Sequence, residues 1–173
     1  MDLSMLVDDL FQAARTGDAD RLRAMLAEHP QLANMENGDG LTPLGYAAHY
    51  GSKEAVQALL EFGAEINATS HSRISFIPSN TALHAAIAGE RSMDVIRLLL
   101  ASGARTDIRD SNGHTCLHSA AFHDDSEALI WLLIEHGADP NAVGEQGETA
   151  LSLAEERGNG RVAELLRGYG GQA

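Results

Sequence analysis

Cysteine is nearly absent from the sequence. Cys116 is the single one among 173 residues, so no intramolecular disulfide can form and nothing favours an oxidising compartment. Long apolar runs are also missing, since Asp2, Asp8 and Asp9 interrupt the apolar start of the chain and no stretch approaches the roughly 20 residues of a membrane span. We therefore predict a soluble, cytoplasmic protein that has no membrane partner.

Basic residues are scarce as well. Twelve Lys and Arg stand against 25 Asp and Glu, which gives a formal net charge of −13 at pH 7. Such a charge repels a phosphate backbone, so nucleic acid is excluded as a partner. The carboxylates are spread along the whole chain, which is typical of a solvated surface, and attraction to a basic patch on a partner is the second interpretation.

Aromatic residues make up only 5% of the chain, whereas Ala, Leu and Gly are abundant and 44% of the residues are hydrophobic. There is enough apolar material for a packed core, so disorder is not expected. This composition favours small, closely stacked helices over a sandwich of strands.

A repeat is the main signal in the sequence. Four related segments begin with threonine, at spacings of 39, 34 and 34 residues: Thr42-Pro43-Leu44, Thr81-Ala82-Leu83-His84, Thr115-Cys116-Leu117-His118 and Thr149-Ala150-Leu151. Three Gly-Ala pairs follow the first three threonines at nearly constant distances of 21, 22 and 22 residues: Gly63-Ala64, Gly103-Ala104 and Gly137-Ala138. A period near 33 residues indicates stacked units, each too small to bury its own apolar face.

Each unit has the pattern of a helix, a turn and a helix. Apolar residues recur at helical spacing on both sides of Gly51 in the second unit. We expect the threonine hydroxyl to cap the first helix and Pro43 to fit its first turn. Gly63 and its counterparts should end the second helix in a left-handed conformation.

These segments resemble the ankyrin repeat, whose Thr-Pro-Leu-His start, Ala-Ala pair and Gly-Ala-Asp ending recur along nearly the whole chain. The resemblance implies an all-α solenoid of helix-turn-helix units with short β-hairpin fingers, in a single domain over 1–173. The expected repeats are 5–37, 38–76, 77–110, 111–144 and 145–169. The first and last diverge like capping repeats, so we expect a complete protein or domain rather than a fragment.

Six extra residues lengthen the second finger, within Thr69–Ser79. The segment contains Arg73, Ile74, Phe76 and Ile77. Loops on rigid scaffolds often carry binding residues, and an aromatic with flanking aliphatics is a plausible anchor for a partner. The alternative is that these apolar side chains fold back over the finger's own groove.

Further candidate partner-binding residues follow from the family's variable surface positions. They are Tyr46, His49, Tyr50, Ile87, Phe122 and His123. Trp131 takes the position of the polar Gln57 and Arg97 in neighbouring units, which indicates an exposed aromatic unless the longer turn rotates it inward.

His84 and His118 share one repeat position, at which the resemblance implies a structural histidine that joins adjacent repeats. His114, Cys116, His118 and His123 form the densest group of possible metal ligands, but their spacing does not suit a convergent tetrahedral site. Cys116 has no nearby base, and adjacent carboxylates such as Glu155 and Glu156 diverge. We therefore predict no catalytic residue, no metal, no cofactor and no enzymatic activity.

The sequence thus predicts a protein-protein interaction module, monomeric when free, that binds another protein through its concave face and fingers. The alternative function is an inhibitor or immunity-type partner of one specific enzyme, in which the negative charge would guide association.

Overall fold

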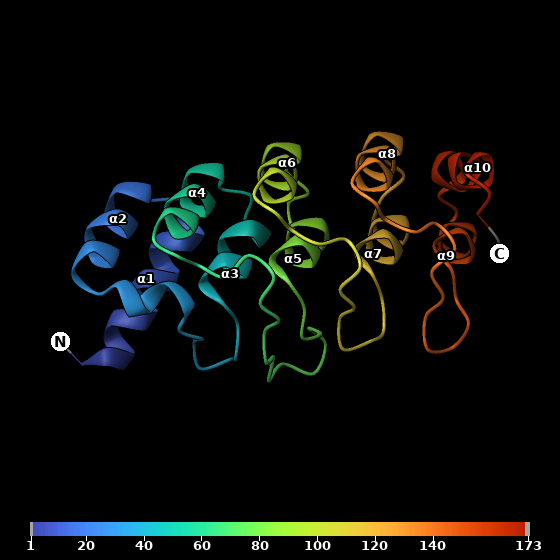
Figure 1. Ribbon diagram of the computed structural model, residues 1–173. Coiled ribbons are helices and arrows are strands. Elements are labelled where there is room, and N and C mark those ends of the chain that lie inside the picture. Colours follow the sequence, from blue (N-terminus) through green and yellow to red (C-terminus); the bar gives the residue numbers. More distant parts are fainter. Residues whose placement is uncertain (1, 172–173) are drawn as a thin grey trace. The chain divides into compact units, whose positions relative to one another are not determined.

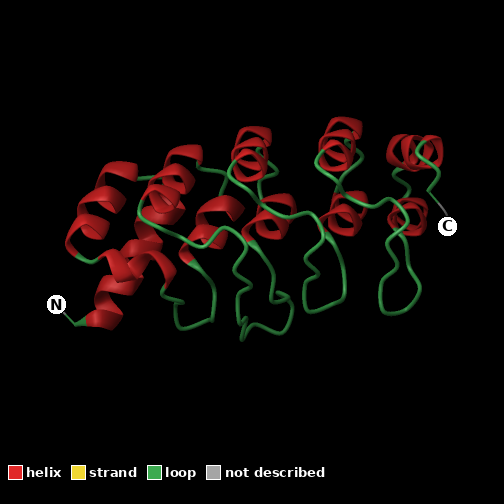
Figure 2. Cartoon of the chain, viewed as in Figure 1, coloured by secondary structure: helices red, strands yellow, loops and turns green. Residues whose placement is uncertain are grey.

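A computed structural model describes residues 2–171 of the chain, and these residues form helices joined by loops, without strands (Figure 2). The helices are α1 (Leu3–Thr16), α2 (Ala19–Glu28), the 3-10 helix η1 (Pro30–Asn34), α3 (Pro43–His49), α4 (Lys53–Glu61), α5 (Ala82–Ala88), α6 (Met93–Ala101), α7 (Cys116–His123), α8 (Glu127–Glu135), α9 (Ala150–Arg157) and α10 (Gly160–Gly168). The chain divides into two compact units, residues 1–104 and 105–173.

The first unit contains two layers of helices (Figure 1). In one layer α3 packs between α1 and α5, and in the other α4 packs between α2 and α6. Each first helix also contacts the second helix of its own pair. Fully buried leucines fill the space between the layers, namely Leu10, Leu22, Leu26, Leu59, Leu83 and Leu99.

The second unit repeats this arrangement with two helix pairs. α7 packs against α9, α8 packs against α10, and each first helix contacts its own second helix. Its fully buried side chains include Leu117, Leu129, Ile130, Leu133 and Leu166. The expectation that apolar faces at helical spacing are buried against neighbouring pairs is confirmed within each unit.

The helix boundaries follow the sequence signals. Thr42 Oγ1 accepts a hydrogen bond from the Gly45 N–H at 3.0 Å, and Thr149 Oγ1 does the same for Ser152 at 3.1 Å. Gly63 and its counterparts after α6 and α8 have φ between 91° and 100°, in the left-handed region. Both the threonine caps and the glycine endings are therefore as predicted.

The fingers differ from the expected β-hairpins. In the described part of the chain they are loops closed by single backbone hydrogen bonds, such as Asn37 N to Leu41 O at 3.1 Å and Gly144 N to Glu148 O at 2.8 Å. One backbone hydrogen bond across a finger is not a regular ladder of paired residues, so these fingers are not assigned as strands.

Candidate functional site: an aromatic surface and a lengthened finger

Four rings cluster on α1, on α3 and at Tyr50, the residue that caps the end of α3. The centroids of Phe11 and Tyr46 lie 5.1 Å apart, as do those of Tyr46 and Tyr50, and His49 lies 5.0 Å from Tyr50. The guanidinium of Arg15 stands 5.3 Å above the ring of Tyr50. This cation-π contact holds an exposed positive charge against the aromatic cluster.

The sequence of α3 explains why these rings reach the surface. Ala47 and Ala48 are fully buried and take one side of the helix, so the residues before and after them face away from the core. Tyr46 and Tyr50 are half-buried against each other, and His49 is exposed. Burial, followed by the neighbouring Tyr50, raises the pKa of the Tyr46 phenol above its usual value, so the Tyr46 phenol is neutral at pH 7.

Internal hydrogen bonds give the lengthened finger a defined conformation. The N–H of Ser70 donates to the Asn80 carbonyl at 2.9 Å, and the N–H of Asn80 donates to Ser70 Oγ at 3.0 Å. Farther along, the N–H of Ser72 donates to Ser79 Oγ at 3.0 Å. These bonds join the two arms at successive levels, so the finger is more ordered than its length alone would suggest.

The same finger is fastened to the preceding one. The N–H groups of His71 and Arg73 donate to the carbonyls of Gly40 and Asp39, both at 2.9 Å. The His71 imidazole Nδ1 lies 2.5 Å from a carboxylate oxygen of Glu36. Gly40 permits this approach, because a Cβ there would lie 1.9 Å from the carbonyl oxygen of His71.

The apolar side chains at the tip of the finger do not all behave alike with respect to folding back over the finger's own groove. Phe76 is 84% exposed, so its ring does not fold back onto the protein. Ile74 and Ile77 are half-buried and flank a turn in which the Ile77 N–H donates to the Ile74 carbonyl at 3.0 Å. Arg73 is exposed, with its guanidinium 3.4 Å from the carbonyl oxygen of Gly38.

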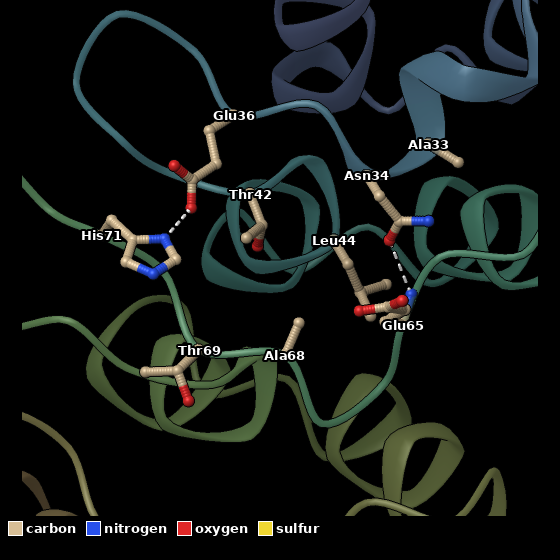
Figure 3. A pocket seen from close by; sticks show the side chains of 9 residues that line it. All are labelled: Ala33, Asn34, Glu36, Thr42, Leu44, Glu65, Ala68, Thr69 and His71. Carbon is tan, nitrogen blue, oxygen red and sulfur yellow. Dashed lines mark hydrogen bonds and ion pairs between the residues drawn. The ribbon is translucent and has the colours of Figure 1, made fainter.

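A pocket of about 390 Å³ lies at the base of the first two fingers (Figure 3). Its lining residues are Ala33, Asn34, Glu36, Thr42, Leu44, Glu65, Ala68, Thr69 and His71. Two of its polar pairs are already joined, since Asn34 accepts from the Glu65 N–H at 2.8 Å and Glu36 pairs with His71. The polar side chains therefore hold the two fingers and the loop after α4 together, rather than converging on a reacting group.

The prediction that Ile87 belongs to the binding surface is wrong. Ile87 has no exposed area and is the last of six consecutive buried residues on α5. Counted from the capping threonine, Ile87 corresponds to the buried Ala48, whereas Ala88 corresponds to the exposed His49. The error was one of register, because a shift of one position moves a residue from the surface of a helix to its buried side.

In the second unit, Phe122 is half-buried and His123 is exposed. Their ring centroids are 5.3 Å apart, and the guanidinium of Arg157 lies 4.5 Å from the Phe122 centroid. A first helix again carries an aromatic group covered by an arginine, here from α9.

Trp131 is 49% exposed on α8, whereas the adjacent Leu132 and Leu133 are buried. The alternative in which the longer turn rotates the indole inward is therefore wrong. Trp131 lies on α8, the second helix of its pair. It is therefore an exposed aromatic residue that does not belong to the surface of the first helices.

His118 occupies a buried, fully bonded position. Its Nδ1 accepts from the Thr115 N–H at 3.2 Å and lies 2.9 Å from Thr115 Oγ1, and its Nε2 lies 3.1 Å from the Glu148 carbonyl oxygen. Since a carbonyl only accepts, Nε2 carries the proton and the imidazole is neutral. His84 is also buried, with its Nδ1 2.9 Å from Thr81 Oγ1.

This geometry predicts a pH dependence of stability. Burial lowers the pKa of His118 below its ordinary 6.5, so the unfolded chain takes up a proton at a pH where the native protein does not. The stabilising contribution is complete above about pH 6.5 and is lost as the pH falls through the lowered pKa. Urea unfolding at about pH 7.5 and about pH 5.5 measures the free energy of unfolding at each pH. Between these two values the free energy of unfolding should fall less for His118→Ser than for the wild type. Equal losses would contradict a neutral, buried His118.

The possible metal ligands and the Cys116 thiol have defined surroundings in the described part of the chain. Within residues 2–171, no three His, Cys, Asp or Glu side chains are placed to hold a metal ion. Burial raises the pKa of the Cys116 thiol to about 12, so it is not a thiolate at pH 7. No helix in this part of the chain is long and apolar enough to cross a bilayer.

Comparison with known proteins identifies the repeats. A family model of three ankyrin repeats matches residues 10–110, 69–144 and 88–172. The chain belongs to the ankyrin-repeat family. Ankyrin repeats generally act as protein-protein interaction modules, in which stacked units provide an extended binding surface.

Relatives share these repeats within much longer proteins. The chain is 33% identical over 108 residues to the rat ankyrin repeat and SAM domain-containing protein 6, and 38% identical over 80 residues to mouse Rabankyrin-5. These matches cover 62% and 46% of this ankyrin-repeat chain, but only 11% and 6% of the relatives. A probable E3 ubiquitin-protein ligase XBOS32 of rice is 48% identical over 59 residues, which are 34% of this chain and 12% of that protein.

Three residues that position this ankyrin-repeat site, one of them the buried Phe11, were missed from the sequence. Phe11 and Arg15 lie in the divergent first repeat, and Gly40 lies in the first finger. Arg15 could have been found by aligning Gly17 with Gly51, which places Arg15 at the surface position of His49. Gly40 offered no comparable signal, because its close neighbour is 31 residues away in the sequence.

Proposed function

We propose that this protein acts by binding another protein through the exposed face of its first helices and through its lengthened finger, and not by catalysis. In the first unit this surface consists of Arg15, Tyr46, His49, Tyr50 and the finger residues Arg73, Ile74, Phe76 and Ile77. Phe122 and His123 are the corresponding candidates in the second unit. His84 and His118 have a structural role in this proposal, as ties between repeats.

The observation that carries the proposal is the exposure of Phe76 on a finger that is hydrogen-bonded both internally and to its neighbour. Exposure of a phenyl ring to water is unfavourable, so burying the ring against a partner favours binding. Because the loop that carries the ring is already ordered, binding costs little conformational entropy. Aromatic and arginine side chains are enriched among the residues that dominate interfaces. Tyr46, Tyr50 and Arg15 supply both kinds of side chain on the adjacent helices.

Replacing Phe76 or Tyr50 with alanine should weaken binding to the natural partner by at least about 1–2 kcal/mol, the range for truncating an interface anchor. The partner would be recovered by affinity purification and mass spectrometry, and each variant would then be titrated against it. Phe76→Ala should change the free energy of unfolding by no more than about 0.5 kcal/mol, since its ring contributes little to the core.

Trp131→Ala is the matched control, because it removes an exposed aromatic from a second helix. It should leave binding unchanged. If Phe76→Ala and Tyr50→Ala both bind like the wild type, or if only Trp131→Ala loses the partner, the proposed face is wrong.

A further inference from the structure

The pocket at the base of the first two fingers lies beside the proposed face but does not belong to it (Figure 3). Thr69 and His71 line it from the lengthened finger, Glu36 from the loop after η1 and Glu65 from the loop after α4. Every lining residue belongs to the first unit, so the cavity is formed within one compact part of the chain. The same finger thus contributes Phe76 at its tip and part of the cavity wall at its base.

The lining of this pocket is negatively charged. Glu36 and Glu65 supply its carboxylates, and neither lysine nor arginine is among the lining residues. A proton on His71 would balance only one of these two carboxylates, so the cavity stays negative in either protonation state of the imidazole. Arg73, two residues beyond His71, does not line the cavity, and its guanidinium lies 3.4 Å from the Gly38 carbonyl oxygen.

These carboxylates keep unused hydrogen-bond acceptors. Within residues 2–171, the bonds of Glu65 involve only its backbone N–H and carbonyl, which pair with Asn34 and Ala68, and its carboxylate has no partner. Glu36 uses one carboxylate oxygen for His71, which leaves the other oxygen available. The contacts that join the two fingers therefore leave acceptor capacity on both acidic side chains.

Both carboxylates act on the same small volume. The cavity holds about 390 Å³, and a sphere of that volume is about 9 Å across, close to the roughly 8–10 Å over which physiological salt screens a charge. Figure 3 shows the Glu36–His71 pair and the Glu65 side chain on opposite sides of the cavity. A cation placed between them is therefore attracted by both.

The geometry favours an organic cation over a metal ion. In the described part of the chain no three His, Cys, Asp or Glu side chains are placed to hold a metal, so the acidic and histidine side chains of the lining do not converge on one point. A guanidinium presents five N–H donors in a plane, which suits acceptors that lie on different sides of a cavity. Ala33, Leu44 and Ala68 form an apolar part of the lining, against which the methylene groups of an arginine can pack.

We propose that this pocket binds an arginine side chain of the partner protein, with the guanidinium between the carboxylates of Glu36 and Glu65. This inference rests on the proposed function and adds to it a site for one particular residue of the partner. The net charge of −13 favours approach of a basic surface, and the pocket gives one of its cations a defined position. The residues next to that arginine would then lie beside the finger that carries Phe76.

The probe for this site is N-acetyl-arginine N-methylamide, titrated into the isotope-labelled full chain and followed by its amide NMR signals. Signals of the lining, including those of Glu65, Ala68 and Thr69, should shift along one saturation curve, and the affinity should fall as NaCl is raised. The citrulline analogue has the same shape without the charge and should bind at least about fivefold more weakly. Equal binding of the two probes, shifts confined to other parts of the chain or no saturable shift would each overturn the inference.

Charge-neutralising variants then locate the contact. Glu65→Gln keeps the size of the side chain and should weaken binding of the arginine probe by at least about threefold. Glu54→Gln is the matched control, because it removes an exposed carboxylate from α4 outside the pocket, and it should change the affinity by no more than about 1.5-fold. If both variants weaken binding equally, the attraction comes from the net charge and the pocket is not the site. Thermal unfolding of each variant confirms that the fold is retained.

The partner recovered by co-purification separates this inference from the proposed function. If Phe76→Ala or Tyr50→Ala weakens binding of the partner but the double variant Glu36→Gln, Glu65→Gln binds it like the wild type, the face is correct and the arginine site is wrong. If only the double variant loses the partner, the arginine site is correct and the proposed face is wrong. If none of these variants affects binding, both proposals are wrong.

Discussion

Replacing Gly40 with alanine is expected to destabilise the protein by about 2–4 kcal/mol, combining backbone strain with a steric overlap. Gly40 has φ of 78°, which alanine rarely adopts, and its Cβ would lie 1.9 Å from the carbonyl oxygen of His71. The overlap should also break the 2.9 Å bond from the His71 N–H to the Gly40 carbonyl and separate the two fingers. Urea unfolding measures the stability, and hydrogen exchange at the His71 and Arg73 amides reports the separation.

Gly147→Ala is the matched control. Gly147 occupies the same turn position in the last finger and has φ of 83°, but a Cβ there has no neighbour within 4 Å. Its replacement should cost only the conformational strain, about 1 kcal/mol. If both variants lose the same free energy of unfolding, the contact between Gly40 and His71 of the next finger does not contribute to stability.

Replacing His118 with alanine is expected to destabilise the protein by about 1–3 kcal/mol, the cost of leaving buried polar groups without partners. The imidazole binds the Thr115 N–H on one side and the Glu148 carbonyl on the other, at 3.2 and 3.1 Å. Alanine leaves both groups unpaired, at the start of α7 and in the finger before α9. Thermal and urea unfolding of the purified variant measure the effect.

His118→Ser separates the two hydrogen bonds. Ser152 occupies the equivalent position in the last repeat, where its hydroxyl accepts from the Thr149 N–H at 2.8 Å. Serine at 118 should restore the bond to Thr115 and leave only the Glu148 carbonyl unpaired, so its cost should be about half that of alanine. A serine variant as unstable as the alanine variant would mean that the contact with Glu148 accounts for the whole effect, and unchanged stability in both would exclude a tie between repeats.

The candidate site was only partly predictable from the sequence. Tyr46, His49 and Tyr50 were assigned to the surface because they take the variable surface positions that the resemblance to the ankyrin repeat implies. Ile87 was placed wrongly by one position, since counting from the capping threonine aligns Ile87 with Ala48 and the neighbouring Ala88 with the surface residue His49. Exposure of Phe76 could not be decided, since an insertion with several apolar residues can either fold back or project.

By itself the sequence determined the architecture: the repeat period, the capping threonines, the glycines after the second helices and the all-α ankyrin family. These features are local, because a cap or a left-handed residue acts within a few positions of its own place in the chain. Only the tertiary structure decided that Arg15 covers Tyr50, that His71 and Arg73 fasten one finger to the next, and that Phe76 faces solvent. Those contacts join residues about 30 or more positions apart or depend on loop conformation, and packing between successive repeats brings them together.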